Sequence, residues 1–243
     1  MVRNKCITHP KNKLESIYTN LSVVLLSAGS YKNFKRSVCA IQLADGQTVV
    51  EKQINAIKTA YPLADITVVV GHDSEYTIEY LLKNFPEIRI IHNERFDETN
   101  NSRSLDLAIM SGQRNNLLVI NGDILFDSEY IKDIVDTSSV LVIDKTKQIT
   151  DDEVGGIVVD GVLTSISHGL PNIWAQIVFL KDNELDIIKK NINEKKNHVK
   201  FLHEIINSSI DNGAIFLAHN QTHGYIKEID NFKDLEKINE NLM

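Results

Sequence analysis

Between residues 21 and 123 the sequence alternates between short apolar segments and longer segments with helical periodicity. The apolar segments, such as LSVVLLSAG at residues 21–29, are rich in aliphatic and β-branched side chains and end close to a glycine. The segments between them, such as residues 48–62, repeat apolar side chains every three or four positions. Continuous apolar runs are typical of strands buried on both faces of a parallel sheet, and their alternation with helices predicts right-handed βαβ units. The sequence therefore predicts an α/β fold with a doubly wound, mostly parallel, Rossmann-like sheet.

The same reasoning gives the expected elements along the chain. In the first half we expect strands at residues 21–29, 65–72, 88–94 and 116–123, and helices at 48–62, 74–85 and 101–112. After residue 128 we expect a small mixed β extension, with strand-like segments at 138–145, 155–168 (with a turn at VVDGV), 172–181, 214–219 and 225–230, and helices at 184–192, 200–213 and 232–242. Residues 1–20 are expected to be a polar lead-in with a short helix at 14–20, and residues 21–243 a single domain.

Composition excludes several classes of protein. The formal net charge is −7, which disfavours a nucleic-acid-binding protein because phosphate backbones select basic surfaces. The apolar runs are too short to cross a bilayer, and the polar N-terminus lacks the apolar core of a signal peptide, so we expect a cytoplasmic protein without a membrane partner. Cys6 and Cys39 have no zinc-type spacing and are expected to be free thiols.

Asp123 follows an apolar strand in LVINGD and therefore lies where such sheets bind ligands, at the carboxyl ends of their strands. Gly122 is expected to let the backbone turn there. A carboxylate at this position suits a hard cation such as Mg²⁺, and Glu228 and Asp230, which share one face of a later strand, are the candidate partners. The alternatives are that Asp123 is a turn residue and that Asp230 is the N-cap of the terminal helix.

Several motifs occur in a characteristic order. They are LSAG (26–29), GQTVVEKQI (46–54), VVVG (68–71), NNSRSL (100–105), NGD (121–123) and EIDNFKDL (228–235). In this order and spacing the chain resembles the nucleotidyltransferase-like family, which comprises sugar-1-phosphate and phosphocholine-type cytidylyltransferases with a type-A glycosyltransferase-like fold. The resemblance covers residues 21–239, and the NNSRSL and EID motifs look most like the branch that uses CTP.

The resemblance implies a reaction in which a phosphorylated small molecule attacks the α-phosphate of a nucleoside triphosphate, with CTP favoured, and pyrophosphate leaves. It implies that Asp123 and Asp230, with Glu228, hold the Mg²⁺. The nucleotide and the substrate would then contact the ends of several strands and the start of one helix. The residues implied in binding are Ser27, Ala28, Gly29, Ser30, Gly71, Asn100, Asn101, Ser104 and Gly122. For Asn100 and Asn101, N-capping of the helix at 101–112 is the alternative.

The first loop departs from the family pattern, which reads L-A-A-G-x-G-x-R and, after a gap, P-K. In this sequence the second glycine falls on Tyr31, the arginine on Asn33, and the proline and lysine on Val38 and Cys39. The cations that steady the triphosphate are thus missing from their places. Lys32, Lys35 and Arg36 lie close in sequence, and Lys35 and Arg36 are the candidate catalytic replacements.

Two other functions remain open. The altered loop fits a catalytically degenerate nucleotide-binding or structural module of the same fold. A type-A glycosyltransferase that uses a sugar nucleotide would need a metal-binding D-x-D motif at a strand end, and Asp123 and Asp127 are spaced too widely for it. Edge strands in residues 138–181 are compatible with a homodimer.

Overall fold

The structure is a computed structural model that describes residues 10–30 and 34–242. Its strands are β1 (Leu21–Ser27), β2 (Asp65–Val70), β3 (Arg89–His92), β4 (Asn116–Asn121), β5 (Ile124–Phe126), β6 (Val140–Ile143), β7 (Val154–Val159), β8 (Val162–His168), β9 (Trp174–Lys181), β10 (Phe216–Asn220) and β11 (Ile226–Glu228). Its helices are α1 (Pro10–Thr19), α2 (Val49–Ala60), α3 (Ser74–Asn84), α4 (Asn101–Met110), α5 (Ser128–Ile131), α6 (Asp182–Ile192), α7 (Leu202–Asp211) and α8 (Phe232–Leu242), with 3₁₀ turns at Val38–Ala40 and Lys195–Asn197.

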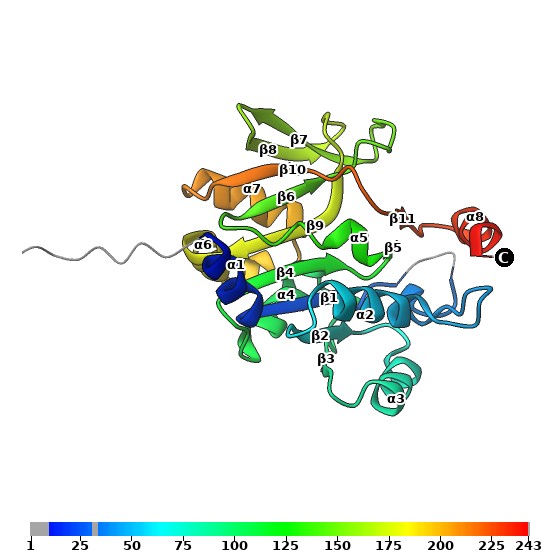
Figure 1. Cartoon of the computed structure of the whole chain (residues 1–243). Helices are drawn as coiled ribbons and strands as arrows, with labels where there is room; N and C mark the ends of the chain where they lie inside the picture. The colour runs from blue at the N-terminus through cyan, green and yellow to red at the C-terminus, as the bar shows by residue number, and fades with distance from the viewer. Residues whose placement is uncertain (1–9, 31–33, 243) are drawn as a thin grey trace, which may run out of the picture.

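Within the described residues, nine strands form one sheet in the order β3-β2-β1-β4-β9-β6-β10-β8-β7. Figure 1 shows β3 at one edge of this sheet and the β7–β8 hairpin at the other. Only β8 and β9 run against the common direction. The predicted fold class, a mostly parallel Rossmann-like sheet with a mixed extension, is confirmed.

The core has two halves, one on each face of the sheet. Val23 and Leu25 of β1 belong to the half that α1, α2, α3 and α5 cover. Val24 and Leu26 belong to the other half, which α4, α6 and α7 cover. Because successive side chains of a strand point to opposite faces, a strand covered on both sides must be apolar at every position. This packing is the physical reason for the unbroken apolar run LSVVLL.

The predicted turn at VVDGV joins β7 to β8. Asp160 and Gly161 both have left-handed backbone angles, with φ of 50° and 80°. Two consecutive residues with positive φ are the signature of a tight two-residue hairpin turn, for which Asp-Gly is a favoured pair. The single expected segment 155–168 is therefore a hairpin, as its turn signal indicated.

The described part of the N-terminal lead-in packs on the domain. Ile17 of α1 is buried in the first half of the core, and Asn116 at the start of β4 donates a hydrogen bond of 3.3 Å to its carbonyl oxygen. The helix also begins earlier than the expected 14–20, at Pro10. None of the helices in the described residues combines the length and apolar character that crossing a membrane requires.

The C-terminal segment returns to the start of the domain. β11 pairs antiparallel with β5, a short strand directly after Asp123 that the sequence analysis missed. α8 then packs beside the first loop, where the rings of Phe232 and Phe34 lie 4.8 Å apart and Asn239 accepts a hydrogen bond of 2.9 Å from the backbone N–H of Ala44. These contacts bring residues 226–230 to the end of β4 (Figure 1).

Candidate functional site

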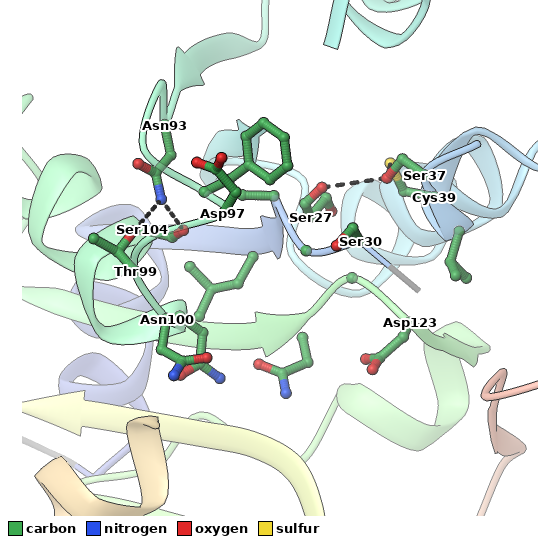
Figure 2. Close-up of a pocket in the computed structure, with 18 of the residues that line it drawn as sticks. Ser27, Ser30, Ser37, Cys39, Asn93, Asp97, Thr99, Asn100, Ser104 and Asp123 are labelled. Atoms are coloured by element: carbon green, nitrogen blue, oxygen red, sulfur yellow. Dashed lines mark hydrogen bonds between the residues drawn. The ribbon is translucent and has the colours of Figure 1, made fainter. Parts of the chain in front are cut away.

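A cavity of about 500 Å³ opens at the carboxyl ends of β1 and β4 and beside the start of α4. Figure 2 shows Ser27, Ser30, Ser37 and Cys39 on one side of it and Asn93, Thr99 and Ser104 on another, with Asp123 just beyond the end of β4. Of the binding residues predicted from the sequence, the cavity is lined by Ser27, Ala28, Gly29, Ser30, Asn100, Asn101, Ser104 and Gly122. Its other described lining residues are Leu26, Ser37, Val38, Cys39, Asn93, Phe96, Asp97, Glu98, Thr99, Asn121, Asp123 and Phe201.

Two glycines let the strand ends approach one another: Gly122 lines the cavity, whereas Gly71, also predicted to bind, is not among its lining residues. A Cβ atom on Gly122 would lie 2.3 Å from Oγ of Ser27, and one on Gly71 would lie 2.6 Å from the carbonyl oxygen of Ala28. Such distances are closer than van der Waals contact, so a side chain at either position would push the strands apart. The expected turn is present at residues 122–123, but the backbone of Gly122 is not left-handed, so the close approach to Ser27 rather than the turn requires a glycine here.

A buried glutamine fixes the segment around Asp123. Gln53 of α2 is fully buried, and its amide donates hydrogen bonds of 2.7 Å to the carbonyl oxygen of Ile124 and 3.3 Å to that of Gly122. The carbonyl oxygen of Asp123 accepts a bond of 2.9 Å from the N–H of Ile229. The sequence analysis gave Gln53 no role. Its signal was a polar side chain within the apolar face of a predicted helix.

The pairing of β5 with β11 brings three carboxylates close together. The register places Glu228 opposite Ile124, next to Asp123, and Asp230 follows two positions later on the same face. One oxygen atom from each of Asp123, Glu228 and Asp230 lies within 4.8 Å of the other two. Three carboxylate oxygens at this spacing are a donor set for a hard divalent cation, so the residues fit the predicted Mg²⁺.

The competing interpretation of Asp230 as a helix cap is wrong. The side chain of Asn231, the next residue, accepts hydrogen bonds of 2.9 Å from the N–H of Lys233 and 3.3 Å from that of Asp234 at the start of α8. By its residue surface area Asp230 is itself exposed, although neighbouring groups remove part of the water around its carboxylate. Partial desolvation of its carboxylate and the negative charge of Glu228 raise its pKa to about 6.

Two further side chains contact the carboxylate group, and the sequence analysis singled out neither. Lys147, between β6 and β7, donates to Glu228 and to both oxygens of Glu153, the latter at 3.0 Å. Burial alone would lower the pKa of Lys147, but these carboxylates outweigh it and raise the pKa. Gln176 lies in a bulge of β9 with φ of 60°, donates to Glu228 and accepts from Asn121.

The side chains of Asn100 and Asn101 join the start of α4 to residues 197–202 by hydrogen bonds. Asn100 occupies the N-cap position but makes no capping bond with its side chain. Its amide instead donates to the carbonyl oxygen of Val199 at 2.8 Å, and the side-chain oxygen of Asn101 accepts from the N–H of Leu202 at 2.7 Å. The N-capping alternative is therefore wrong, and these two residues shape one wall of the cavity.

The Ser104 side chain is hydrogen-bonded to the segment that precedes α4. Its hydroxyl accepts a hydrogen bond of 3.2 Å from the amide of buried Asn93, and the same amide donates to Thr99 at 3.3 Å (Figure 2). Asn93 also accepts from the N–H of Arg95 at 3.2 Å. The amide of Asn93 thus fixes residues 95–99 against α4.

In the described part of the first loop, neither Lys35 nor Arg36 brings positive charge to the cavity lining. The guanidinium of Arg36 stacks 4.1 Å above the ring of Tyr76 on α3, and the backbone of Lys35 contacts the His72 ring. Neither side chain is among the described residues that line the cavity, and their catalytic assignment stays a prediction. Tyr31, Lys32 and Asn33, like Cys6, lie outside the described residues.

At the position of the family lysine the cavity has Cys39, whose sulfur contacts the Ser37 hydroxyl at 3.2 Å. Burial raises the pKa of the Cys39 thiol, so it is neutral. The described lining residues include the carboxylates Asp97, Glu98 and Asp123 and no lysine or arginine. These described lining residues thus offer no side-chain cation to an anionic ligand.

We compared the chain with protein-family models, curated proteins and solved structures. No protein-family model matches the chain. The curated bifunctional protein GlmU from a Nitratiruptor species is 24% identical over 230 residues, which are 87% of this chain and 52% of that protein. The chain thus spans about half the length of this curated relative.

The solved structure of CTP:phosphocholine cytidylyltransferase from Streptococcus pneumoniae is similar over 92% of this chain and 100% of its own, with a TM-score of 0.74 and 19% identity. Inositol-1-phosphate CTP transferase from T. maritima has a TM-score of 0.74 and 17% identity over 91% of this chain and 94% of its own. The resemblance predicted from the motifs is confirmed at the level of the fold. This chain has the fold of the nucleotidyltransferases that act on phosphorylated small molecules.

Proposed function

We propose that this protein transfers a nucleotidyl group, with CMP from CTP favoured, to a phosphorylated small molecule and releases pyrophosphate. The observation that carries the proposal is the group of Asp123, Glu228 and Asp230 beside a cavity at the carboxyl ends of parallel strands. A cavity of about 500 Å³ is within the usual size range for small-molecule sites. The fold shared with cytidylyltransferases supports the same reaction class.

The residues present suggest how the work would be divided. A divalent ion held by Asp123 and Asp230, with Glu228 beside them, would supply positive charge to the phosphates of the nucleotide. The backbone from Ser27 to Ser30 would contact the nucleotide at the end of β1. Gly122 allows the close packing that holds Asp123 against this loop. The chain itself therefore binds and orients, which is the main contribution of a protein to phosphoryl transfer.

The alternative is a nucleotide-binding or structural module that lacks catalysis. It is favoured by the absence of lysine and arginine among the described lining residues and by the stacking of Arg36 on Tyr76. Positive charge beside the departing pyrophosphate normally stabilises the transition state. The enzyme and a nucleotide-binding module would both bind a metal–nucleotide complex, but only the enzyme would form a product. A structural module would do neither.

The first test is thermal unfolding with each nucleoside triphosphate, with and without Mg²⁺. A ligand at 100 times its dissociation constant stabilises the folded protein by about 2.7 kcal/mol. We expect a shift with CTP that requires Mg²⁺, that is lost in Asp123→Asn, and that persists in Asp186→Asn, an exposed carboxylate on α6. No shift with any nucleotide would contradict the enzyme and favour the structural module.

The second test is pyrophosphate release from CTP and Mg²⁺ with phosphocholine, inositol 1-phosphate or glucose 1-phosphate as acceptors. We expect release with one acceptor class and none from Asp123→Asn. Nucleotide binding without release for any of the acceptors would favour the non-catalytic module.

A further inference from the structure

A lysine that does not belong to the first loop contacts the group of three carboxylates formed by Asp123, Glu228 and Asp230. The ammonium group of Lys147 contacts Glu228 and both oxygens of Glu153, and its side chain is only 23% exposed. Asp144, at the end of β6, also lines the small space between Lys147 and Glu228. Because the pair is largely shielded from solvent, salt screens its charges less than those of a surface ion pair. Lys147 is thus a persistent positive charge beside a predicted metal site.

The position of this charge is fixed from two sides. Glu228 directs one oxygen to Lys147 and the other to the amide of Gln176. The left-handed backbone of Gln176, which non-glycine residues seldom adopt, places its side chain there. An oxygen of Glu228 in turn lies within 4.8 Å of oxygens of Asp123 and Asp230. The carboxylate of Glu228 therefore lies between the ammonium group of Lys147 and the place where a cation would bind.

A positive charge at this place has two opposite electrostatic effects. It repels a bare divalent cation that approaches the carboxylates, because the interaction between like charges is unfavourable at short range. It attracts the phosphates of a nucleotide and offsets the repulsion between those phosphates and the acidic cavity wall, where Asp97 and Glu98 lie.

We propose that Lys147 tunes the carboxylate group to bind a divalent metal together with a nucleotide rather than the bare ion. Lys147 would then be a positioning and charge-balancing residue that takes over part of the electrostatic role of the missing loop cations. The nucleotide half of this proposal rests on the proposed function, whereas the metal half does not.

The test measures Mn²⁺ binding from the electron paramagnetic resonance signal of the free ion, and separately the binding of CTP with Mg²⁺. We expect Lys147→Met to bind bare Mn²⁺ at least about threefold more tightly than the wild type, and CTP with Mg²⁺ at least about tenfold more weakly, a change of about 1.4 kcal/mol. Lys147→Arg should restore both values, and Lys145→Met, which removes an exposed neighbouring lysine, should change neither. Opposite changes in the two affinities distinguish charge balance from simple loss of structure.

A second variant keeps the lysine and tests the same reasoning in the other direction. Glu153→Gln removes a negative charge from the partner of Lys147, so bare Mn²⁺ should bind more weakly and CTP with Mg²⁺ more tightly. This variant decides the question if Lys147→Met does not give the circular dichroism of the folded wild type.

Unchanged or weaker Mn²⁺ binding by folded Lys147→Met overturns the proposal, and so does an absence of Mn²⁺ binding in both the wild type and this variant. If the wild type binds Mn²⁺ but no nucleotide, the proposed function fails, while the Mn²⁺ affinities of the variants still decide the role of Lys147.

Discussion

Gln53 is the residue whose replacement most directly tests how this chain holds Asp123 in place. Its fully buried amide donates hydrogen bonds to the carbonyl oxygens of Gly122 and Ile124, on either side of the carboxylate. Gln53→Met keeps the length and nearly the volume of the side chain but removes both donors. The carbonyl oxygens then lose a partner in a place that solvent does not reach.

The expected cost follows from these two bonds. A buried acceptor that loses its partner costs about 1–3 kcal/mol. The bond of 2.7 Å to Ile124 should account for most of the loss, and the bond of 3.3 Å to Gly122 for less. We therefore expect Gln53→Met to lower the free energy of unfolding by about 2 kcal/mol, which is about 4–8 °C in the melting temperature of a chain of this size.

The assay is equilibrium unfolding in urea, followed by thermal unfolding with CTP and Mg²⁺. The control is Asn55→Met, which introduces the same side chain at an exposed position of the same helix and should change stability by less than about 0.5 kcal/mol. The folded variant should also lose most of its nucleotide-dependent shift, because small displacements of a site residue weaken binding and catalysis. Stability of Gln53→Met within about 0.5 kcal/mol of the wild type would refute the reasoning.

Three further changes test other parts of the structure. Gly122→Ala should destabilise the protein by about 1–3 kcal/mol in thermal unfolding, because its Cβ would lie 2.3 Å from Oγ of Ser27; an unchanged melting temperature would contradict that close approach. Asn231→Ala should cost about 1 kcal/mol in urea unfolding through loss of the α8 cap, whereas a loss below about 0.2 kcal/mol would mean that the cap is unimportant. Burial, and secondly the charge of His168, lower the pKa of His203, so its proton binds mainly to the unfolded chain and stability should fall as the pH drops below about 6.5. His203→Gln should make the unfolding free energy less dependent on pH between about 7.5 and 5, and an unaltered pH dependence would assign the effect to other groups.

The location of Asp123 was predictable because a single local pattern encodes it. A continuous apolar run predicts a strand covered on both faces, and the residue after such a strand lies at the edge of the sheet where ligands bind. The approach of Glu228 and Asp230 was suggested by motif order, yet its physical cause is the pairing of β11 with β5. The three residues of β5 are too few for their periodicity to distinguish them from a loop.

Other side chains of the site make contacts with distant segments, which no local sequence pattern encodes. Asn100 and Asn101 carried the signal of a helix cap, and the structure directs their side chains to Val199 and Leu202 instead. Lys147 stood in a polar segment with nothing to distinguish it from its neighbours, and its partner Glu228 is 81 positions further along the chain.

The sequence by itself determined the alternation of strands and helices, the two-faced burial of the central strands, the β7–β8 turn and the placement of Asp123 at a strand end. Each depends on the periodicity or backbone preference of a few consecutive residues, which the chain carries wherever it folds. Only the tertiary structure decided that Gln53 anchors the Asp123 segment, that Gln176 and Lys147 hold Glu228, and that Arg36 stacks on Tyr76. These contacts depend on which distant segments pack together, because a polar side chain finds its partner only after the apolar core has brought the two segments within hydrogen-bonding distance.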